Sequence, residues 1–218
     1  MHAEPSWNML VHSQILGLSA AQRWQRGGDA DIDTLDSGDS DSDHCAAGPV
    51  RFMPCTTARI LGAWRGSGAG SSKMIDFSLF IDPSGFDEPA VTAIESMRKS
   101  LPGLSINHTD YAPLHQRPIV LSIETKTTGH QLLDAEVQVG VWMAAHWQML
   151  AGLARQQSPQ SGTLGTNTDD GEAMLDQALP SFLPAIVVQG HEWHFLATTR
   201  TRECTVRHPC SSIKFLIV

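Results

Sequence analysis

The sequence predicts an α/β (α+β) architecture, in which helices pack on a central sheet. Short apolar runs typical of strands, β-branched or alternating with polar residues, occupy residues 73–83, 117–126 and 185–199. Stretches with helical periodicity precede or separate these runs, at residues 4–21, 87–101 and 132–153. Because the order is helix, strand, helix, strand, helix, strand, strand, a layered fold is favoured over an all-helical or all-strand one.

Length and composition limit the class of protein. With 218 residues, 41% of them hydrophobic, the chain is expected to form one domain over residues 1–218. The net charge of -8 argues against a general nucleic-acid coat protein but leaves a locally basic groove open. No apolar run reaches the roughly 18 to 20 residues that span a bilayer. The four cysteines show no C-x-x-C spacing, so we expect free thiols in an intracellular protein, nuclear or cytoplasmic, without membrane contact. The oligomeric state stays open.

The first part of the chain contains one predicted helix and a polar tract. Residues 4–21 are expected to form an amphipathic helix, with Pro5 in its first turn. Residues 27–48, rich in Asp, Ser and Gly, and residues 155–173, rich in Gly, Ser, Thr and Gln, are too polar to be buried. Both segments are therefore expected to be disordered loops.

The later elements have individual signatures. Residues 87–101 are expected to form a surface helix, and residues 132–153 a long, mostly apolar helix that is central to the packing. The segment 185–199 is expected to be a strand pair that turns near residues 189–192. Alternation in the 73–83 strand puts Asp76 on one face and four apolar residues on the other, namely Ile75, Phe77, Leu79 and Ile81.

Three short motifs imitate known sites without their essential residues. From Asp39 the D-x-D-x-D spacing of a calcium loop is present, but His44 replaces the required Gly and Val50 the bidentate Glu. The glycine-rich stretch 66–73 lacks the Gly-Lys-Ser/Thr ending of a phosphate loop. The H-E-x-H spacing at 191–194 is one residue short of the helical zinc motif. None of the three therefore predicts a site.

Three charged side chains do indicate a candidate site. Asp76 lies within an otherwise apolar strand, where an unpaired carboxylate would cost about several kcal/mol. Glu124 and Lys126 lie two residues apart at the end of the next strand, so they share one face. If the two strands pair, both carboxylates enter one cleft, and a divalent cation such as Mg²⁺ would offset their repulsion. The alternative is a purely structural cluster of ion pairs.

The helix at 132–153 favours the functional interpretation. Gln138 lies on its apolar side, where a side-chain amide needs a hydrogen-bond partner in the core or in the cleft. Trp142, one turn later, is expected to support Gln138. Trp147 and His146 are expected to pack or to lie on the helix surface, and Trp193 to pack on the sheet rather than stack on a base.

The irregular stretch before the charged strand contains further polar side chains. Asn107, His108 and Asp110 are expected to stabilise turns through side-chain hydrogen bonds. The alternative is that these three residues line the cleft or contact phosphate.

Together these residues resemble the PD-(D/E)xK nuclease superfamily. The pattern Asp76…Glu124-Thr-Lys126 carries the resemblance, and Gln138-x-x-x-Trp142 is similar to the trailing motif of the RecB-like exonuclease branch. Five ordered blocks are more closely similar to a fungal family with a PD-(D/E)xK nuclease-like domain: Trp7-Asn-x-x-Val-His12, Ile106-Asn-His-Thr-Asp-Tyr111, Ser122-Ile-Glu-Thr-Lys126, Gln138-x-Gly-Val-Trp142 and Gln189-Gly-His-Glu-Trp193.

The resemblance implies a restriction-endonuclease-like fold, a mixed central sheet flanked by helices, and a metal-dependent nuclease that hydrolyses phosphodiester bonds of DNA or RNA. It implies that Asp76 and Glu124 bind Mg²⁺ (or Mn²⁺), that Lys126 is the general base or orients water, and that Gln138 completes the catalytic set. Glu4 corresponds to an extra acidic metal ligand that some members supply from the first helix. For Glu4, stabilisation of the helix macrodipole is the alternative.

A second hypothesis is a nuclease-like fold without catalysis, serving as a binding or scaffold protein or as an accessory protein of fungal secondary metabolism. The acidic balance favours this hypothesis, whereas the intact Asp, Glu and Lys pattern favours a nuclease. Two departures from the family pattern stand out. Residues 87–114 must be an insertion that leaves the flanking strands adjacent, and residues 207–218 are interpreted as a truncated end with exposed apolar side chains.

Overall fold

The computed structural model describes residues 50–66, 74–126, 132–157, 175–201 and 205–214. The predicted helix at 4–21, its residue Glu4 and the predicted loop at 27–48 lie outside these described residues, as does the loop at 155–173 beyond Gln157. Among the described helices, none is both long and apolar enough to cross a membrane.

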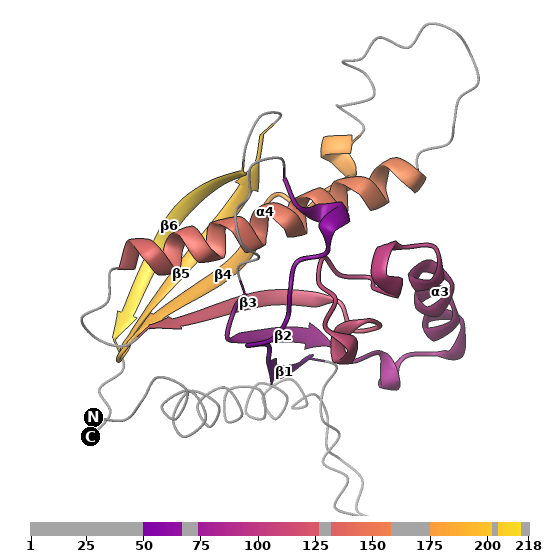
Figure 1. The fold of residues 1–218 in the computed structure, drawn as a ribbon, viewed down its shortest axis with the longest axis horizontal. Coiled ribbons are helices and arrows are strands. Elements are labelled where there is room, and N and C mark those ends of the chain that lie inside the picture. The colour runs from indigo at the N-terminus through magenta and orange to yellow at the C-terminus, as the bar shows by residue number, and fades with distance from the viewer. Residues whose placement is uncertain (1–49, 67–73, 127–131, 158–174, 202–204, 215–218) are drawn as a thin grey trace, which may run out of the picture.

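The centre of the molecule is a six-stranded mixed sheet in the order β1-β2-β3-β4-β5-β6 (Figure 1). Neighbouring strands pair antiparallel except β3 and β4, which are parallel. The strands are β1 (Val50–Pro54), β2 (Phe77–Ile81), β3 (Ile119–Lys126), β4 (Leu183–Gln189), β5 (Glu192–Arg200) and β6 (Thr205–Lys214). The mixed sheet with helices confirms the predicted α/β class.

A long helix connects the two parallel strands. Helix α4 (Leu132–Gln157) crosses the sheet and contacts β3, β4 and β6, as expected for a crossover between parallel strands (Figure 1). It extends beyond the predicted end at residue 153, into the start of the predicted loop at 155–173.

Helix α3 (Glu88–Lys99) lies to one side of the sheet, within the segment between β2 and β3. The Asp87 side chain caps its first turn by accepting a hydrogen bond from the Ala90 amide. β2 and β3 are hydrogen-bonded neighbours, so the adjacency expected of the strands that flank residues 87–114 is confirmed.

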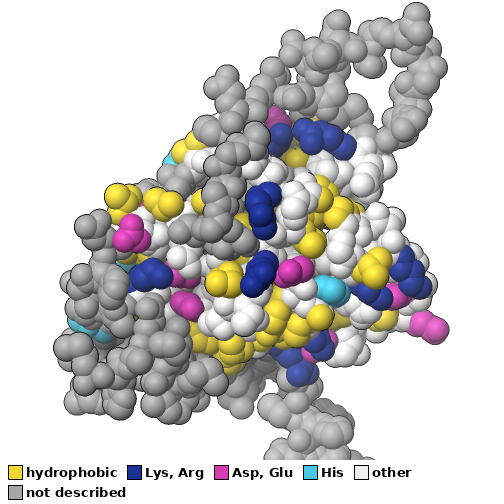
Figure 2. All heavy atoms as spheres, in the orientation of Figure 1, with side chains coloured by type: hydrophobic (Ala, Val, Ile, Leu, Met, Phe, Trp, Pro, Cys, Tyr) yellow, Lys and Arg dark blue, Asp and Glu magenta, His cyan; other side chains and the backbone are white. Residues whose placement is uncertain are grey.

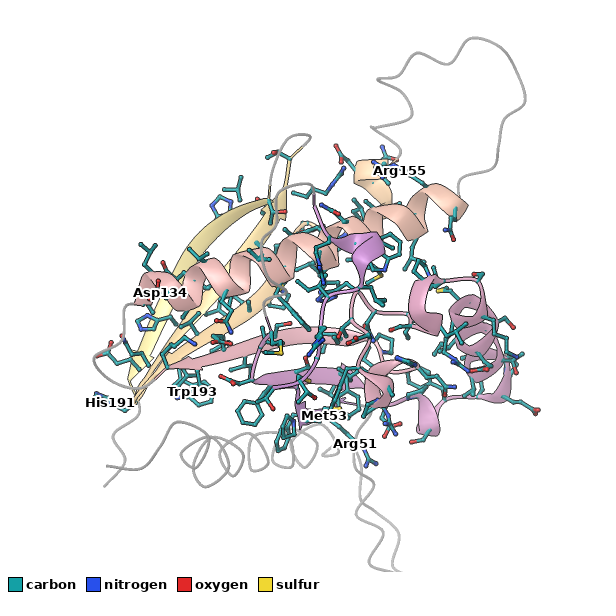
Figure 3. The ribbon with its side chains drawn as sticks, in the orientation of Figure 1. Arg51, Met53, Asp134, Arg155, His191 and Trp193 are labelled. Atoms are coloured by element: carbon teal, nitrogen blue, oxygen red, sulfur yellow. The ribbon has the colours of Figure 1, made fainter. Side chains whose placement is uncertain are left out.

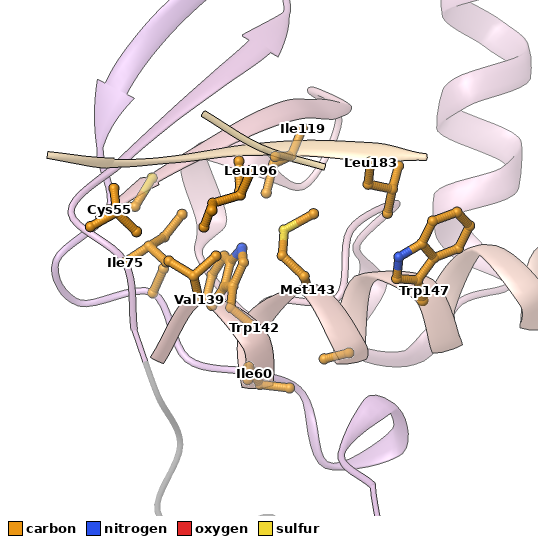
Figure 4. Packing of buried hydrophobic residues seen from close by; sticks show 14 of the residues in the cluster. Cys55, Ile60, Ile75, Ile119, Val139, Trp142, Met143, Trp147, Leu183 and Leu196 are labelled. Atoms are coloured by element: carbon orange, nitrogen blue, oxygen red, sulfur yellow. The ribbon is translucent and has the colours of Figure 1, made fainter. Parts of the chain in front are cut away.

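The main core fills the space between α4 and the sheet (Figure 4). Trp142, Met143 and Trp147 of α4 are each at most 2% exposed and pack with strand residues such as Leu196. A second apolar cluster, Phe77 with Ile123 and Val188, lies on the opposite face of the same strands. The central strands therefore carry apolar residues on both faces, which explains their nearly continuous apolar sequences.

The 73–83 strand differs from its prediction. β2 begins only at Phe77, so Asp76 precedes the strand instead of lying in its middle. Ile75 joins the main core, whereas Phe77 belongs to the second cluster, so these two residues do not share a face. Strand alternation cannot apply to Ile75, because the regular pairing of β2 with β3 starts two residues later.

Two strands were not predicted. β1 pairs with β2 from Val50 to Pro54. β6 pairs with β5 from Thr205 to Lys214, so most of the segment interpreted as a truncated apolar end is a strand of the sheet. Its sequence contains Pro209 and few β-branched residues. The segment therefore forms a strand because it pairs with β5, more than because of its local strand preference.

The predicted strand pair at 185–199 is confirmed as β4 and β5, with the turn at residues 190–191. Gly190 has a φ of 60°, a conformation that glycine adopts without steric cost. Within the described part of the chain, Cys55 is a free, buried thiol, and burial raises its pKa to about 11.

Candidate functional site

Glu124 and Lys126 form a close ion pair at the end of β3. The Lys126 Nζ donates a hydrogen bond to Glu124 Oε1 at 2.5 Å. The Glu124 side chain is 1% exposed and that of Lys126 is 18% exposed. The prediction that the two side chains share one face of the strand is therefore confirmed. A carboxylate this deeply buried needs such a cation, because burying it alone would cost about several kcal/mol.

Asp76 lies beside the same stretch of β3. Its peptide N–H donates to the Ile123 carbonyl at 3.1 Å. Its Oδ2 accepts two hydrogen bonds from Thr125, one from the peptide N–H at 2.8 Å and one from the hydroxyl at 2.5 Å. These bonds bring Asp76 against the residue between Glu124 and Lys126. The Oδ1 of Asp76 accepts no hydrogen bond from the described part of the chain.

The role of Thr125 was missed by sequence reasoning. Alternation points its side chain to the face opposite Glu124 and Lys126. The Thr125 hydroxyl donates a hydrogen bond to the Asp76 carboxylate, which approaches β3 from the side of β2. The only sequence signal was a threonine between the two charged residues, a position that the motif leaves unspecified.

Helix α4 fixes the backbone that leads to Asp76. The Gln138 Nε2 donates to the Met74 carbonyl at 2.5 Å. This contact confirms that the amide on this side of α4 has a hydrogen-bond partner. Because Met74 is two residues before Asp76, the bond ties the helix to the segment that carries the carboxylate.

Trp142 does not support Gln138, contrary to the prediction. Its Nε1 donates to the Ser122 hydroxyl at 3.0 Å, and the indole is fully buried. Ser122 precedes Glu124 by two residues on the same face of β3. Trp142 therefore positions the strand that carries Glu124 and Lys126, through a bond between residues far apart in the sequence.

Two buried histidines pack beside Trp142. The ring of His108 stacks on that of His146, with centroids 4.7 Å apart, and meets the Trp142 ring edge-on at 4.4 Å. Burial, and secondarily the neighbouring His146, hold the pKa of His108 well below its ordinary range. Burial lowers the pKa of His146 to about 4. Both imidazoles are therefore neutral at neutral pH, and His146 is in the core and not on the helix surface.

The prediction of stabilising side-chain hydrogen bonds is confirmed for Asn107 and Asp110 but is wrong for His108, whose buried ring nitrogens have no hydrogen-bond partner among the described residues. The Asn107 Nδ2 donates to the carbonyls of Leu114 and Arg117 at 2.5 and 2.9 Å, and its Oδ1 accepts from the Ile119 amide at 3.0 Å. Asn107 thereby fixes the entry into β3. Asp110 accepts a hydrogen bond from the Arg59 amide at 3.0 Å.

The remaining candidate groups lie in β5 or outside the described residues. His194 Nε2 lies 3.7 Å from Glu192 Oε2 in β5, and Trp193 packs against the second apolar cluster as expected. Glu4 lies outside the described residues. Within the described ranges, no group of three or more His, Cys, Asp or Glu side chains could hold a metal ion.

The chemistry of the cluster suits a hard divalent cation. Asp76 and Glu124 supply carboxylate oxygens from neighbouring segments of the sheet, and Asp76 has one oxygen that accepts no hydrogen bond from the described residues. Mg²⁺ is commonly held by one or two carboxylates, with waters and substrate phosphate completing its coordination. Lys126 adds a positive charge next to these oxygens. The structure thus brings both carboxylates to the same stretch of β3, with Asp76 bonded to Thr125 and with Glu124 paired with Lys126 on the opposite face.

Comparison with known proteins places the chain in a family. A family model described as the PD-(D/E)XK nuclease superfamily matches residues 1–214. No curated protein and no solved structure matched the chain.

Proposed function

Because the chain belongs to the PD-(D/E)XK nuclease superfamily, we propose that it hydrolyses phosphodiester bonds of nucleic acid at Asp76, Glu124 and Lys126. Its mixed six-stranded sheet with helices is consistent with the restriction-endonuclease-like fold of this superfamily. One observation carries the proposal. The Asp76 carboxylate bonds to Thr125, 49 residues later in the chain, and so lies against the Glu124-Thr125-Lys126 segment.

Asp76 and Glu124 would hold the divalent cation, Mg²⁺ or Mn²⁺, that nucleases of this superfamily typically use. When bound, such an ion polarises the scissile phosphate and lowers the pKa of a water molecule that attacks it. The donor set favours a hard cation, because both side chains offer carboxylate oxygens and no thiolate or imidazole takes part.

The other residues of the cluster prepare this site. The Lys126 ammonium, which pairs with Glu124, would stabilise negative charge that develops on the phosphate oxygens. Thr125 orients the Asp76 carboxylate, and Gln138 fixes the backbone two residues before it. Trp142 holds β3 through Ser122. Each contact fixes a catalytic side chain or its backbone before substrate arrives.

A binding module without cleavage is the second candidate. It is favoured by the observation that Lys126 pairs with Glu124 and that Asp76 accepts two hydrogen bonds from Thr125. Such a cluster is stable as part of a fold without any substrate. The net charge of -8 also favours weak or local contact with nucleic acid over general affinity.

Cleavage assays separate the two candidates. Purified protein is incubated with supercoiled plasmid, single-stranded DNA or RNA in the presence of Mg²⁺ or Mn²⁺, and the products are separated by electrophoresis. We expect metal-dependent cleavage that Asp76→Ala and Lys126→Ala each reduce by about 100-fold or more. Glu88→Ala and Lys99→Ala are matched controls, because both side chains are exposed on α3. They should cleave like the wild type.

Two outcomes would overturn the nuclease proposal. One is the lack of metal-dependent cleavage by folded, pure protein on all three substrates. The other is equal cleavage by the wild type and the Asp76 and Lys126 variants, which would assign the activity to a contaminant or to another site. Circular dichroism spectra and melting temperatures of the variants would verify that each is folded.

A further inference from the structure

A cavity of about 550 Å³ lies near the C-terminal end of α4. Its walls come from the helix η2 (Gly62–Trp64), from the C-terminal half of α4 and from the adjoining ends of β5 and β6. Figure 3 labels Arg155 at this end of α4 and Asp134 at the other end. Gln138, which belongs to the proposed active site, is 17 residues before Arg155, so the Arg155 end of the cavity is about 25 Å along the helix from Gln138 at about 1.5 Å per residue.

The described lining of the cavity carries two guanidinium groups and no carboxylate. Arg155 and Arg200 both line it. Arg155 is exposed and makes no ion pair or hydrogen bond within the described ranges. Arg200 has one acidic neighbour, Asp176, at a long distance of 3.8 Å, and that carboxylate is 66% exposed. Figure 2 shows basic side chains gathered over this end of the helix. Among the described residues, Arg200 thus has one exposed carboxylate beside it and Arg155 has none.

An aromatic wall adjoins the two arginines. The Trp64 ring lies directly on α4 at Gly152, where an added Cβ would come within 2.8 Å of it. The half-buried ring is thus held in place on the helix, and its Nε1 is buried without a hydrogen-bond partner. Gln148 adds an exposed amide to the same cavity. Small side chains of α4, such as Ala144, leave the space beside these groups open.

We propose that this cavity binds one nucleotide unit of a nucleic-acid strand. Guanidinium groups bind phosphate oxygens in a bidentate manner, so Arg155 and Arg200 would hold the phosphate. Bases stack on aromatic rings with little sequence preference, so Trp64 would take the base. The volume of about 550 Å³ falls within the range of pockets that hold small ligands.

The inference that the nucleotide unit belongs to a strand rests on the proposed function, since a nuclease must hold a strand. At about 3.4 Å per nucleotide along a stacked strand, the separation of about 25 Å corresponds to roughly seven nucleotides. The cavity would thus hold the strand roughly seven nucleotides from the bond that is cleaved. Strands much shorter than this would not reach both sites at once.

Binding can be measured without cleavage. A fluorescein-labelled single-stranded DNA of 12 nucleotides is titrated in EDTA, and the fluorescence anisotropy gives the Kd. We expect Arg155→Gln and Gln148→Glu each to raise the Kd about tenfold, the second by placing a carboxylate beside the phosphate. Both positions are exposed, so these variants should melt like the wild type. Arg155→Gln should also lower the slope of log Kd against log salt by about one ion.

Arg51→Gln is the matched control. It removes the same charge from β1, on the lower side of the view in Figure 3, where Arg51 pairs with Asp82 at 3.2 Å. Its Kd should stay within about twofold of the wild type. If Arg51→Gln weakens binding as much as Arg155→Gln does, or if neither cavity variant changes the Kd, the cavity is not the binding site.

Two further arms distinguish the sources of the ligand and the two proposals. If a nucleoside monophosphate competes as strongly as the labelled strand, and Arg155→Gln weakens both equally, the cavity takes a free nucleotide and the strand proposal is wrong. Binding that depends on Arg155 without any cleavage would refute the nuclease proposal and support the cavity. If the protein cleaves nucleic acid but its Kd does not depend on Arg155, the cavity proposal is wrong and the nuclease proposal is supported.

Discussion

The stacked histidines His108 and His146 should make the folded state sensitive to mild acid. Burial lowers the pKa of both side chains below the ordinary value of 6.5. In the unfolded chain both imidazoles bind protons as the pH falls through about 6.5, whereas in the folded state they stay neutral. The unfolded state therefore binds more protons in this window, so the free energy of unfolding decreases as the pH falls. The stabilisation is present above pH 6.5.

The size of the effect follows from the pKa of His146. Each proton bound only by the unfolded chain changes the free energy of unfolding by about 1.4 kcal/mol per pH unit. For a pKa that falls from 6.5 to about 4 on folding, acidification from about pH 7.5 to about pH 5 costs about 2 kcal/mol. His108 adds a further loss in the same direction. Domains have total stabilities of about 5 to 15 kcal/mol, so this loss is easily measured.

The assay is urea unfolding, followed by tryptophan fluorescence, at several values between about pH 5 and pH 7.5. Few carboxylates titrate in this window, so histidines dominate the slope. His146→Leu should reduce the slope by up to about 1.4 kcal/mol per pH unit, whatever its effect on stability at pH 7.5. His191→Leu, at an exposed position in the turn between β4 and β5, is the control and should keep the wild-type slope. A slope unaffected by His146→Leu would refute the reasoning.

Two further substitutions test the contacts that position β3. Asn107→Ala removes hydrogen bonds to Leu114, Arg117 and Ile119 and leaves buried backbone groups unpaired, so urea unfolding should show a loss of about 3 kcal/mol. A loss below about 1 kcal/mol, the usual limit for one hydrogen bond, would contradict this role. Trp142→Phe keeps an aromatic ring but loses the bond to Ser122, so the free energy of unfolding should fall by about 1 to 2 kcal/mol. If β3 is positioned through this bond, the variant should also lower kcat of the proposed nuclease more than it raises KM, and unchanged kcat would argue against it.

Local sequence predicted the elements whose side chains have a strong period. The apolar run before Glu124 was sufficient for β3, and the long apolar stretch after residue 131 was sufficient for α4. Strand β6 could not be predicted in this way, because its sequence includes Pro209 and its pairing with β5 supplies the order. β2 also starts later than the sequence predicted, because regular pairing with β3 begins after Asp76.

The same distinction between local sequence and tertiary structure applies to the candidate site. The sequence by itself determined that Glu124 and Lys126 share a face, because the period of a strand is a local property. Only the tertiary structure decided that Thr125 donates a hydrogen bond to Asp76 and that Trp142 donates one to Ser122. Hydrogen bonds and burial depend on which distant segments the fold brings together, and no spacing along the chain specifies them. The same holds for the stack of two histidines and for the cavity with two arginines.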